Sequence, residues 1–278
     1  MIESFNLKNQ LYISFAQTQV ELKTNLEEVL ISIKEQFRGM LVENINESVA
    51  KFLVDKKDNI YNLKCLNNDQ ILAQDNDIDF FLIKIKYHVI TTLINANSQF
   101  LWIHAGAVSK EEKAIIFPAS GGAGKSSFVY YLVQKGWQYL SDDVVAIDLQ
   151  QNKILPVPQT PRIRHNIVNL VSEENLVTIP KKVMIIPEKS YCYHALSIYG
   201  IIFPNFVKQE KLLFQICSES QTLRELLVNC INFPQHRSIA MKFLVNLVKQ
   251  IKSLEIKYYN RNSVYPLLEN KIQELILK

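Results

Sequence analysis

The stretch that most constrains this chain runs from Ala119 to Ser126 and reads Ala-Ser-Gly-Gly-Ala-Gly-Lys-Ser. The chain holds only seven glycines in 278 residues, and three of them fall between positions 121 and 124. Glycine adopts positive φ at no steric cost, and a loop rich in glycine lets several backbone N–H groups converge on an anion. The stretch therefore predicts a phosphate-binding loop.

The segments on both sides of the loop support this interpretation. Residues 113–118 have the apolar pattern of a buried strand, and residues 127–135 have the pattern of a helix that ends at Gly136. This order places a helix N-terminus against the anion. We expect Lys125 to reach the β- and γ-phosphates of ATP and Ser126 to ligate Mg²⁺. The other expected nucleotide-binding positions are Ser120, Gly121, Gly122, Ala123, Gly124 and Ser127. Ala119 replaces the first glycine of the usual motif, and the alternative is a glycine-rich turn before an ordinary helix.

Two adjacent carboxylates, Asp142 and Asp143, follow the loop after one predicted helix and one predicted strand. Acids in this place hold Mg²⁺ or activate the acceptor in phosphate-transfer enzymes. Adjacent strand residues point to opposite faces, so both can serve only where the strand bends or ends, and the pattern breaks at Ser141. The alternative is an acidic turn. His104 falls within a predicted strand, residues 100–108, beside the strand that feeds the loop; it is a candidate site residue or a core histidine.

The patterning predicts an α+β chain of two domains, a small module at 1–97 and a second domain at 98–278. In the first, we expect strands at 11–15 and 20–23, a hairpin from 60–66 to 70–73, and helices at 26–37 and 77–96, the latter capped by Asp77 or Asp79. In the second, we expect strands at 183–187, 196–204 and 211–216 and helices at 222–233 and 239–254, capped by Ser220 and Ser238. A final helix within 262–277 would follow a turn at Tyr265-Pro266, and such a tail is typical of a lid or of a homo-oligomer contact.

Composition excludes several classes of partner. The net charge of +4 is spread over 31 basic and 27 acidic residues, without the clustered basic face of a nucleic-acid-binding protein. No apolar run approaches the roughly 18 residues that span a bilayer, so we expect no membrane partner. The N-terminus lacks the pattern of an export signal, and the four cysteines are isolated. We therefore expect a reduced, cytoplasmic protein.

With these motifs in place, the chain resembles the C-terminal catalytic domain of HPr kinase/phosphorylase, and more closely the shorter HPr-kinase-like proteins of peptide-maturation and other biosynthetic clusters. The resemblance covers roughly residues 100 to 165. Its motifs are His104-Ala-Gly-Ala-Val, 119–127, 132–137, Leu140-Ser-Asp-Asp-Val-Val, Pro156-Val-Pro and Pro161-Arg-Ile-Arg164. It implies a P-loop domain of phosphoenolpyruvate-carboxykinase-like type with a mixed sheet, which uses ATP and Mg²⁺ to phosphorylate a hydroxyl.

The resemblance also implies roles for single residues. Lys125 and Ser126 would bind phosphates and metal, Asp142 would be the general base, and Asp143 would be a metal-side or supporting carboxylate, although the division of roles between the two aspartates stays open. His104 would lie near the acceptor and the γ-phosphate. Arg162 or Arg164 would offer charge to the transferring phosphoryl group, although both could instead line a solvated strand. Ser127 replaces the family's usual glutamate and the later arginine- and glycine-rich signature is not visible, which leaves reverse phosphorolysis and HPr as a substrate open.

Three functions are consistent with these features. The first is an ATP- and Mg²⁺-dependent kinase that acts on a serine of a peptide or protein, or on an alcohol of a small biosynthetic intermediate. The second is a nucleotide-binding regulatory or scaffold subunit of a biosynthetic complex without phosphotransfer, and the third is a simple ATPase. The paired carboxylates favour the kinase, because a pure binding protein needs no base. The sequence does not identify the acceptor.

Overall fold

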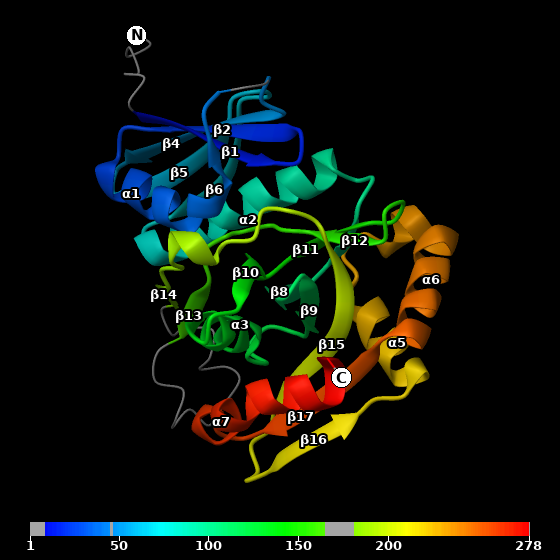
Figure 1. Cartoon of the computed structure of the whole chain (residues 1–278). Helices are drawn as coiled ribbons and strands as arrows, with labels where there is room; N and C mark the ends of the chain where they lie inside the picture. Colours follow the sequence, from blue (N-terminus) through cyan, green and yellow to red (C-terminus); the bar gives the residue numbers. More distant parts are fainter. Residues whose placement is uncertain (1–8, 45–46, 165–180, 278) are drawn as a thin grey trace. The chain divides into compact units, whose positions relative to one another are not determined.

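The structure is a computed structural model that describes residues 9–44, 47–164 and 181–277. The chain divides into two compact units, residues 1–98 and 99–278. Each has its own β-sheet with helices packed on it (Figure 1). Both large sheets combine parallel and antiparallel pairs, so the fold is α+β.

The first unit is a six-stranded sheet with two helices. Its strands are β1 (Gln10–Phe15), β2 (Thr18–Thr24), β3 (Leu41–Val42), β4 (Ala50–Lys57), β5 (Ile60–Cys65) and β6 (Gln70–Asp75), in the order β3-β1-β2-β4-β5-β6. The helices are α1 (Glu27–Gln36) and α2 (Ile78–Ala96), and a 3-10 turn spans Arg38–Met40. The two expected strands, the expected hairpin and both helices are confirmed, and the carboxylate of Asp77 caps α2 by accepting from the amides of Asp79 and Phe80.

Strand β4 was not predicted, although it lies inside the sheet and pairs with β2 and β5. Its side chains alternate between buried and more exposed positions until Lys56 and Lys57, which are exposed. Asp55 and the two terminal lysines hide the period-two pattern, because three charged residues in a row make the end of the segment resemble a solvated loop.

The second unit is built on a nine-stranded sheet. Its strands are β7 (Leu101–Ile103), β8 (Ala105–Lys110), β9 (Lys113–Pro118), β10 (Gln138–Ser141), β11 (Val145–Asp148), β12 (Lys153–Leu155), β15 (Leu196–Phe206), β16 (Leu212–Ile216) and β17 (Lys252–Tyr258). The main order is β10-β8-β9-β15-β12-β11-β7, with β17 parallel to β15 and antiparallel to β16. A separate pair joins β13 (Arg162–Arg164) to β14 (Lys181–Val183).

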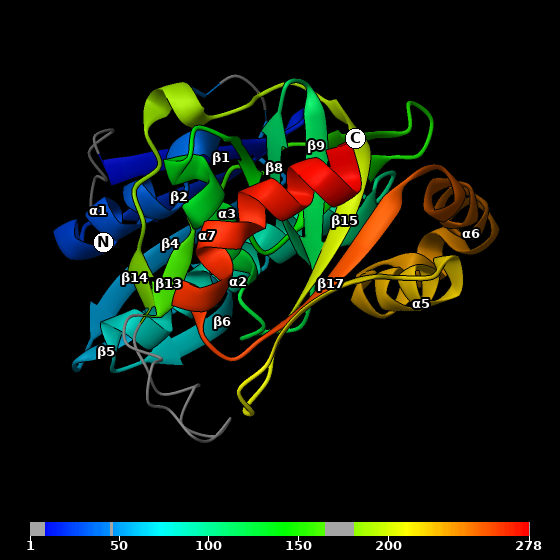
Figure 2. The same ribbon diagram turned by 60° about the horizontal axis from the view of Figure 1, so that its bottom comes forward.

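Helices cover both faces of this sheet, as Figure 2 shows for α7 on one side and α5 and α6 on the other. The helices are α3 (Lys125–Gln134), α5 (Glu219–Asn229), α6 (Phe233–Gln250) and α7 (Arg261–Ile272), followed by a π-helical turn at Gln273–Leu277. A hydrophobic core lies on each face of the sheet, and successive residues of β9 belong to opposite cores. Ile115 and Phe117 face α3 and α7, whereas Ala114 and Ile116 face α5 and α6. The sheet is therefore buried on both faces, which agrees with the near-continuous apolar runs of its strands.

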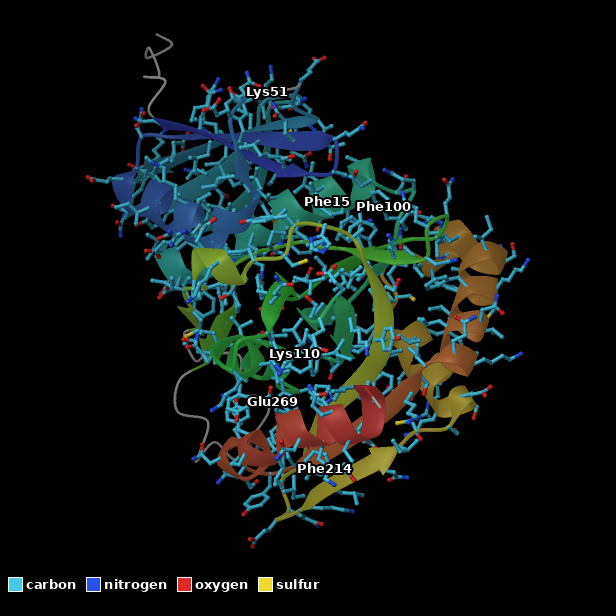
Figure 3. All side chains as sticks on the ribbon, viewed as in Figure 1. Phe15, Lys51, Phe100, Lys110, Phe214 and Glu269 are labelled. Carbon is cyan, nitrogen blue, oxygen red and sulfur yellow. The ribbon has the colours of Figure 1, made fainter. Side chains whose placement is uncertain are left out.

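An ion pair connects α7 to the hairpin of β8 and β9. The Nζ of Lys110 donates to Oε1 of Glu269 at 2.7 Å, and the indole N–H of Trp137 donates to the same oxygen at 3.2 Å; Lys110 and Glu269 are labelled in Figure 3. These charge-assisted bonds lower the pKa of Glu269, with the hydrogen bond from Lys110 as the main cause. The pair helps to hold α7 beside α3.

Several expected boundaries in the second unit were wrong. The predicted helix 239–254 ends at Gln250, and residues 252–258 form β17, because their burial alternates along a strand between β15 and β16. The predicted strand 183–187 is a strand only up to Val183. Pro266 lies inside α7 rather than in a turn, since Asn260 already caps the helix.

One of the two predicted serine caps was wrong. Ser218, not Ser220, caps α5 by accepting from the amide of Gln221. The start of α6 follows Asn232, and the backbone leaves helical geometry at Arg237, next to the expected cap Ser238.

Candidate functional site

The loop between β9 and α3 has the backbone geometry that its glycines predict. Gly122 and Gly124 have positive φ, at 91° and 105°, and α3 begins directly after Gly124. Gly121 and Ala119 do not have positive φ. Position 119 therefore does not need a glycine, so the Ala119 departure from the usual motif costs the loop nothing in backbone strain.

Lys125 points back over the loop from the first turn of α3. Its Nζ donates to the carbonyl oxygens of Ala119 at 2.6 Å and Ser120 at 3.0 Å. It also lies 3.0 Å from Nε2 of His104, and since an ammonium group only donates, that nitrogen is the acceptor. Lys125 is 5% exposed, so a positive charge is held almost out of water, at the N-terminus of a helix. This arrangement favours an anion beside it.

His104 lies at a break between two strands, which corrects the prediction of one continuous strand at 100–108. Before it, β7 pairs with β11, and after it, β8 pairs with β9 and β10. The amide of His104 donates to the carbonyl of Asn229 at 2.8 Å, at the end of α5. This anchor fixes the imidazole where it meets Lys125.

The acid pair lies where β10 ends, as the break at Ser141 predicted. Asp143 has a φ of 72°, and its carbonyl accepts from the amide of Ala105 at 3.1 Å, so the chain turns sharply between β10 and β11. The two carboxylates differ in setting: Asp142 is 1% exposed, whereas Asp143 is partly exposed. The turn therefore buries one acid and presents the other.

Two buried hydrogen bonds hold the end of β10, directly before this turn, against residues 157–159. The hydroxyl of Ser141 accepts from the amide of Val157 at 2.7 Å, and the phenol of Tyr139 donates to the carbonyl of Gln159. Burial, with the charge of Asp142 as a second cause, raises the pKa of Tyr139 well above its ordinary value. Tyr139 therefore stays a neutral donor, and the supporting bond persists across the physiological pH range.

The glycine-rich loop, Lys125, His104 and Asp143 line one pocket with a volume of about 140 Å³. Its described lining consists of His104, Gly121, Gly122, Gly124, Lys125, Ser126, Ser127, Asp143, Arg162, Ile163 and Arg261. The lining carries three cationic side chains and one carboxylate, so its charge favours an anion. Pockets for whole ligands usually measure about 300–1,000 Å³. This pocket therefore suits a compact anionic group rather than an entire nucleotide.

Most of the predicted site residues meet in this pocket, and among those whose side chains the structure describes, three do not line it. Asp142 is 1% exposed and lies near Gly106 of β8. Ser120 and Ala123 line a second pocket, of about 400 Å³, that is bounded by β15, β17 and α5. Arg162 reaches the first pocket from β13, whereas the side chain of Arg164 lies outside what the structure describes.

Arg261 is the charged lining residue that the sequence reasoning missed, and Ile163 is an apolar one. Arg261 is the first residue of α7, directly after the cap Asn260. Strands β9, β15 and β17 run parallel, so the end of β17 lies at the same edge of the sheet as the loop that follows β9, and Arg261 reaches the pocket from there. The interpretation of residues 239–254 as a helix concealed the strand that brings Arg261 to the loop. An alternating segment followed by an asparagine cap was the available signal.

The protein donors for a metal are few. The described residues contain no cluster of three or more His, Cys, Asp or Glu side chains that could enclose a cation. Mg²⁺, however, usually keeps several waters and binds through one or two carboxylates together with phosphate oxygens. The hydroxyl of Ser126 and the carboxylate of Asp143 line the same pocket, so the residues present fit that mode.

Comparisons with known proteins add little to this geometry. The sequence matches no protein-family model and no curated protein. Among solved structures, the chain is similar to the HPr(Ser) kinase/phosphatase from Coxiella burnetii, with 13% identity over 62% of this chain and 97% of that chain and a TM-score of 0.33. A likeness of this strength assigns no activity to the chain. Among the described helices, none has the length and apolar character to cross a bilayer.

Proposed function

We propose that the protein is an ATP- and Mg²⁺-dependent kinase that transfers the γ-phosphoryl group to a hydroxyl. One observation carries the proposal: a glycine-rich loop at a helix N-terminus, Lys125, His104, Asp143 and two arginines line a single cationic pocket. Backbone N–H groups, a helix dipole and fixed cations are the elements that stabilise a transferring phosphoryl group.

The loop and its lysine would hold the phosphate chain. In the structure, Lys125 donates to two loop carbonyls, and phosphate oxygens are stronger acceptors for the same donors because they are charged. Arg162 and Arg261 line the same pocket, where their charges would face the outer phosphates. Ser126 is the residue that would hold Mg²⁺ together with the phosphate oxygens, whose charge the ion would neutralise; Asp143 lines the same pocket and is kept for the acceptor. The pocket size agrees with binding of the phosphates alone, with the nucleoside outside it.

The acceptor hydroxyl would approach from the side of Asp143 and His104. A bond forms between the acceptor oxygen and the γ-phosphorus, the bond from that phosphorus to the bridging oxygen breaks, and ADP leaves. The hydroxyl proton passes to a carboxylate. We assign that carboxylate to Asp143, because Asp143 is the one carboxylate among the described lining residues and a base must reach the proton that it accepts. Asp142 would instead support the turn from its buried position.

The assignment is tested with a matched pair of variants, Asp143→Asn and Asp142→Asn. Purified protein is incubated with γ-labelled ATP, Mg²⁺ and candidate peptides or small alcohols, and the label is followed. We expect wild type to move label to an acceptor, and Asp143→Asn to retain ATP binding while losing at least about 100-fold in transfer. Loss of transfer in Asp142→Asn alone would return the base to Asp142.

The same assay separates the proposed function from its alternatives. Release of inorganic phosphate without a labelled acceptor would indicate an ATPase. Saturable ATP binding without either product would indicate a regulatory or scaffold subunit. Absence of ATP binding would refute the proposal.

A further inference from the structure

Tyr258, the last residue of β17, contacts the loop from outside the pocket. Its hydroxyl donates to the carbonyl oxygen of Ala123 at 2.8 Å. The residue is 1% exposed, and its ring packs against Phe128 of α3 and Phe206 of β15, with centroids 5.1 Å and 5.6 Å away. Burial raises the pKa of Tyr258, an effect that nearby Arg261 opposes, so the phenol stays protonated and able to donate.

This hydrogen bond fixes the orientation of one loop peptide. No described peptide bond is cis, and in a planar trans peptide the C=O and the N–H point in opposite directions. When the Ala123 carbonyl is held toward Tyr258, the N–H of Gly124 must point the other way. Gly124 lines the cationic pocket, whereas Ala123 does not.

Gly124 could not be replaced without moving Tyr258. A Cβ built on Gly124 would lie 1.9 Å from the Tyr258 hydroxyl oxygen, and the φ of Gly124 is +105°. The hydroxyl therefore occupies the space that a side chain would need. Glycine also makes the peptide easy to turn, because both signs of φ are open to it. Some other group must then hold the peptide in one orientation, and Tyr258 is in contact with it.

We infer that Tyr258 is a positioning residue for phosphate binding, which holds the peptide between Ala123 and Gly124 so that the Gly124 N–H serves the pocket. The inference rests on the proposed function. Without the hydroxyl, the peptide can turn its carbonyl toward the pocket, where it would repel phosphate oxygens and remove one donor.

The test compares Tyr258→Phe with a matched control, Tyr259→Phe. Both variants lose one phenolic hydroxyl from adjacent positions, but the Tyr259 hydroxyl donates to Glu210 at the surface, 3.1 Å away. Titration calorimetry gives the affinity of each protein for ATP with Mg²⁺ and for inorganic tripolyphosphate. We expect Tyr258→Phe to weaken both ligands about 2- to 12-fold, the worth of one hydrogen bond, and the control to change neither.

A second measurement reports on the peptide itself. Because the chain has only seven glycines, a spectrum of protein labelled with ¹⁵N-glycine is simple enough to follow Gly124, identified by its loss in Gly124→Ala. We expect the Gly124 amide to shift or broaden in Tyr258→Phe without nucleotide, and to be unchanged in Tyr259→Phe.

The outcomes distinguish the inference from the function beneath it. If wild type and Tyr258→Phe bind ATP and tripolyphosphate equally tightly, the positioning role is wrong while the nucleotide site stands. If wild type binds neither ligand, the proposed function fails and the inference fails with it. A purely structural role would lower the melting temperature of Tyr258→Phe but leave its tripolyphosphate affinity unchanged, which also overturns the inference.

Discussion

Gly106 lies on β8 and faces Val129 of α3, and its replacement by alanine is a direct test of that contact. A Cβ built on Gly106 would lie 2.7 Å from Cγ2 of Val129, well inside van der Waals contact. The backbone φ at Gly106 is ordinary, so the cost comes from overpacking and not from strain. Overpacking of a close-packed core costs about 1–3 kcal/mol. For a unit of this size, that cost lowers the melting temperature by about 2 to 12 °C.

The site would also respond to this variant. The Gly106 Cβ position is 3.8 Å from both Oδ1 of Asp142 and Cβ of Lys125, so a displaced α3 moves the lysine relative to the acid turn. Thermal unfolding and ATP titration are the assays. We expect Gly106→Ala to melt lower and to bind ATP more weakly.

A double variant refines the argument. Val129→Ala alone should cost about 1.5 kcal/mol or more, because it removes two buried methyl groups. Val129→Ala together with Gly106→Ala should cost at least about 1 kcal/mol less than the sum of the two, because the alanine Cβ then fills the space that Cγ2 left. Additive effects, or a Gly106→Ala protein as stable as wild type, would refute the close approach.

Two further predictions concern stability. The pKa of Glu269 is lowered from an ordinary 4.5 by its bond from Lys110, so its ionised form stabilises the fold above pH 4.5 and this contribution is lost as pH falls through the lower folded pKa. Denaturant unfolding should therefore show a deficit in Glu269→Gln at pH 7 that shrinks below pH 4.5; a deficit independent of pH would contradict the ion pair. Ser141→Ala leaves the buried amide of Val157 without its acceptor, so its free energy of unfolding should fall by about 1–3 kcal/mol, whereas an unchanged value would show that the hydroxyl is dispensable.

Local patterns were sufficient where neighbours in sequence are neighbours in space. The strand, loop and helix around Lys125 follow from a buried run, a cluster of glycines and a helical period within about 25 residues. Helix α2 follows from its spacing and its Asp77 cap. The helices contain their own hydrogen-bond partners, and β9, although it pairs with β8 and the distant β15, is marked by a continuous apolar run next to the glycines.

The parts that could not be predicted depend on distant partners. β17 is a strand because β15 and β16 pair with it, and its own residues also fit a helical period. That error hid Arg261 and Tyr258, which reach the loop from more than 130 positions away in the sequence. The end of the strand at Ser141 was predicted, but the choice of Asp143 for the pocket depends on a turn with positive φ, which no local pattern specified.

The central claim, that the loop of Lys125 binds the phosphates of ATP, is tested most directly by equilibrium titration of ATP with Mg²⁺ into wild type, Lys125→Ala and Lys135→Ala. Lys135 follows the other end of the same helix and controls for loss of a lysine. The site predicts saturable binding of one ATP by wild type and by Lys135→Ala, and an affinity at least about 10-fold weaker in Lys125→Ala, because a charge-assisted contact is lost. Equal affinity in all three proteins, or no binding by wild type, would contradict the claim.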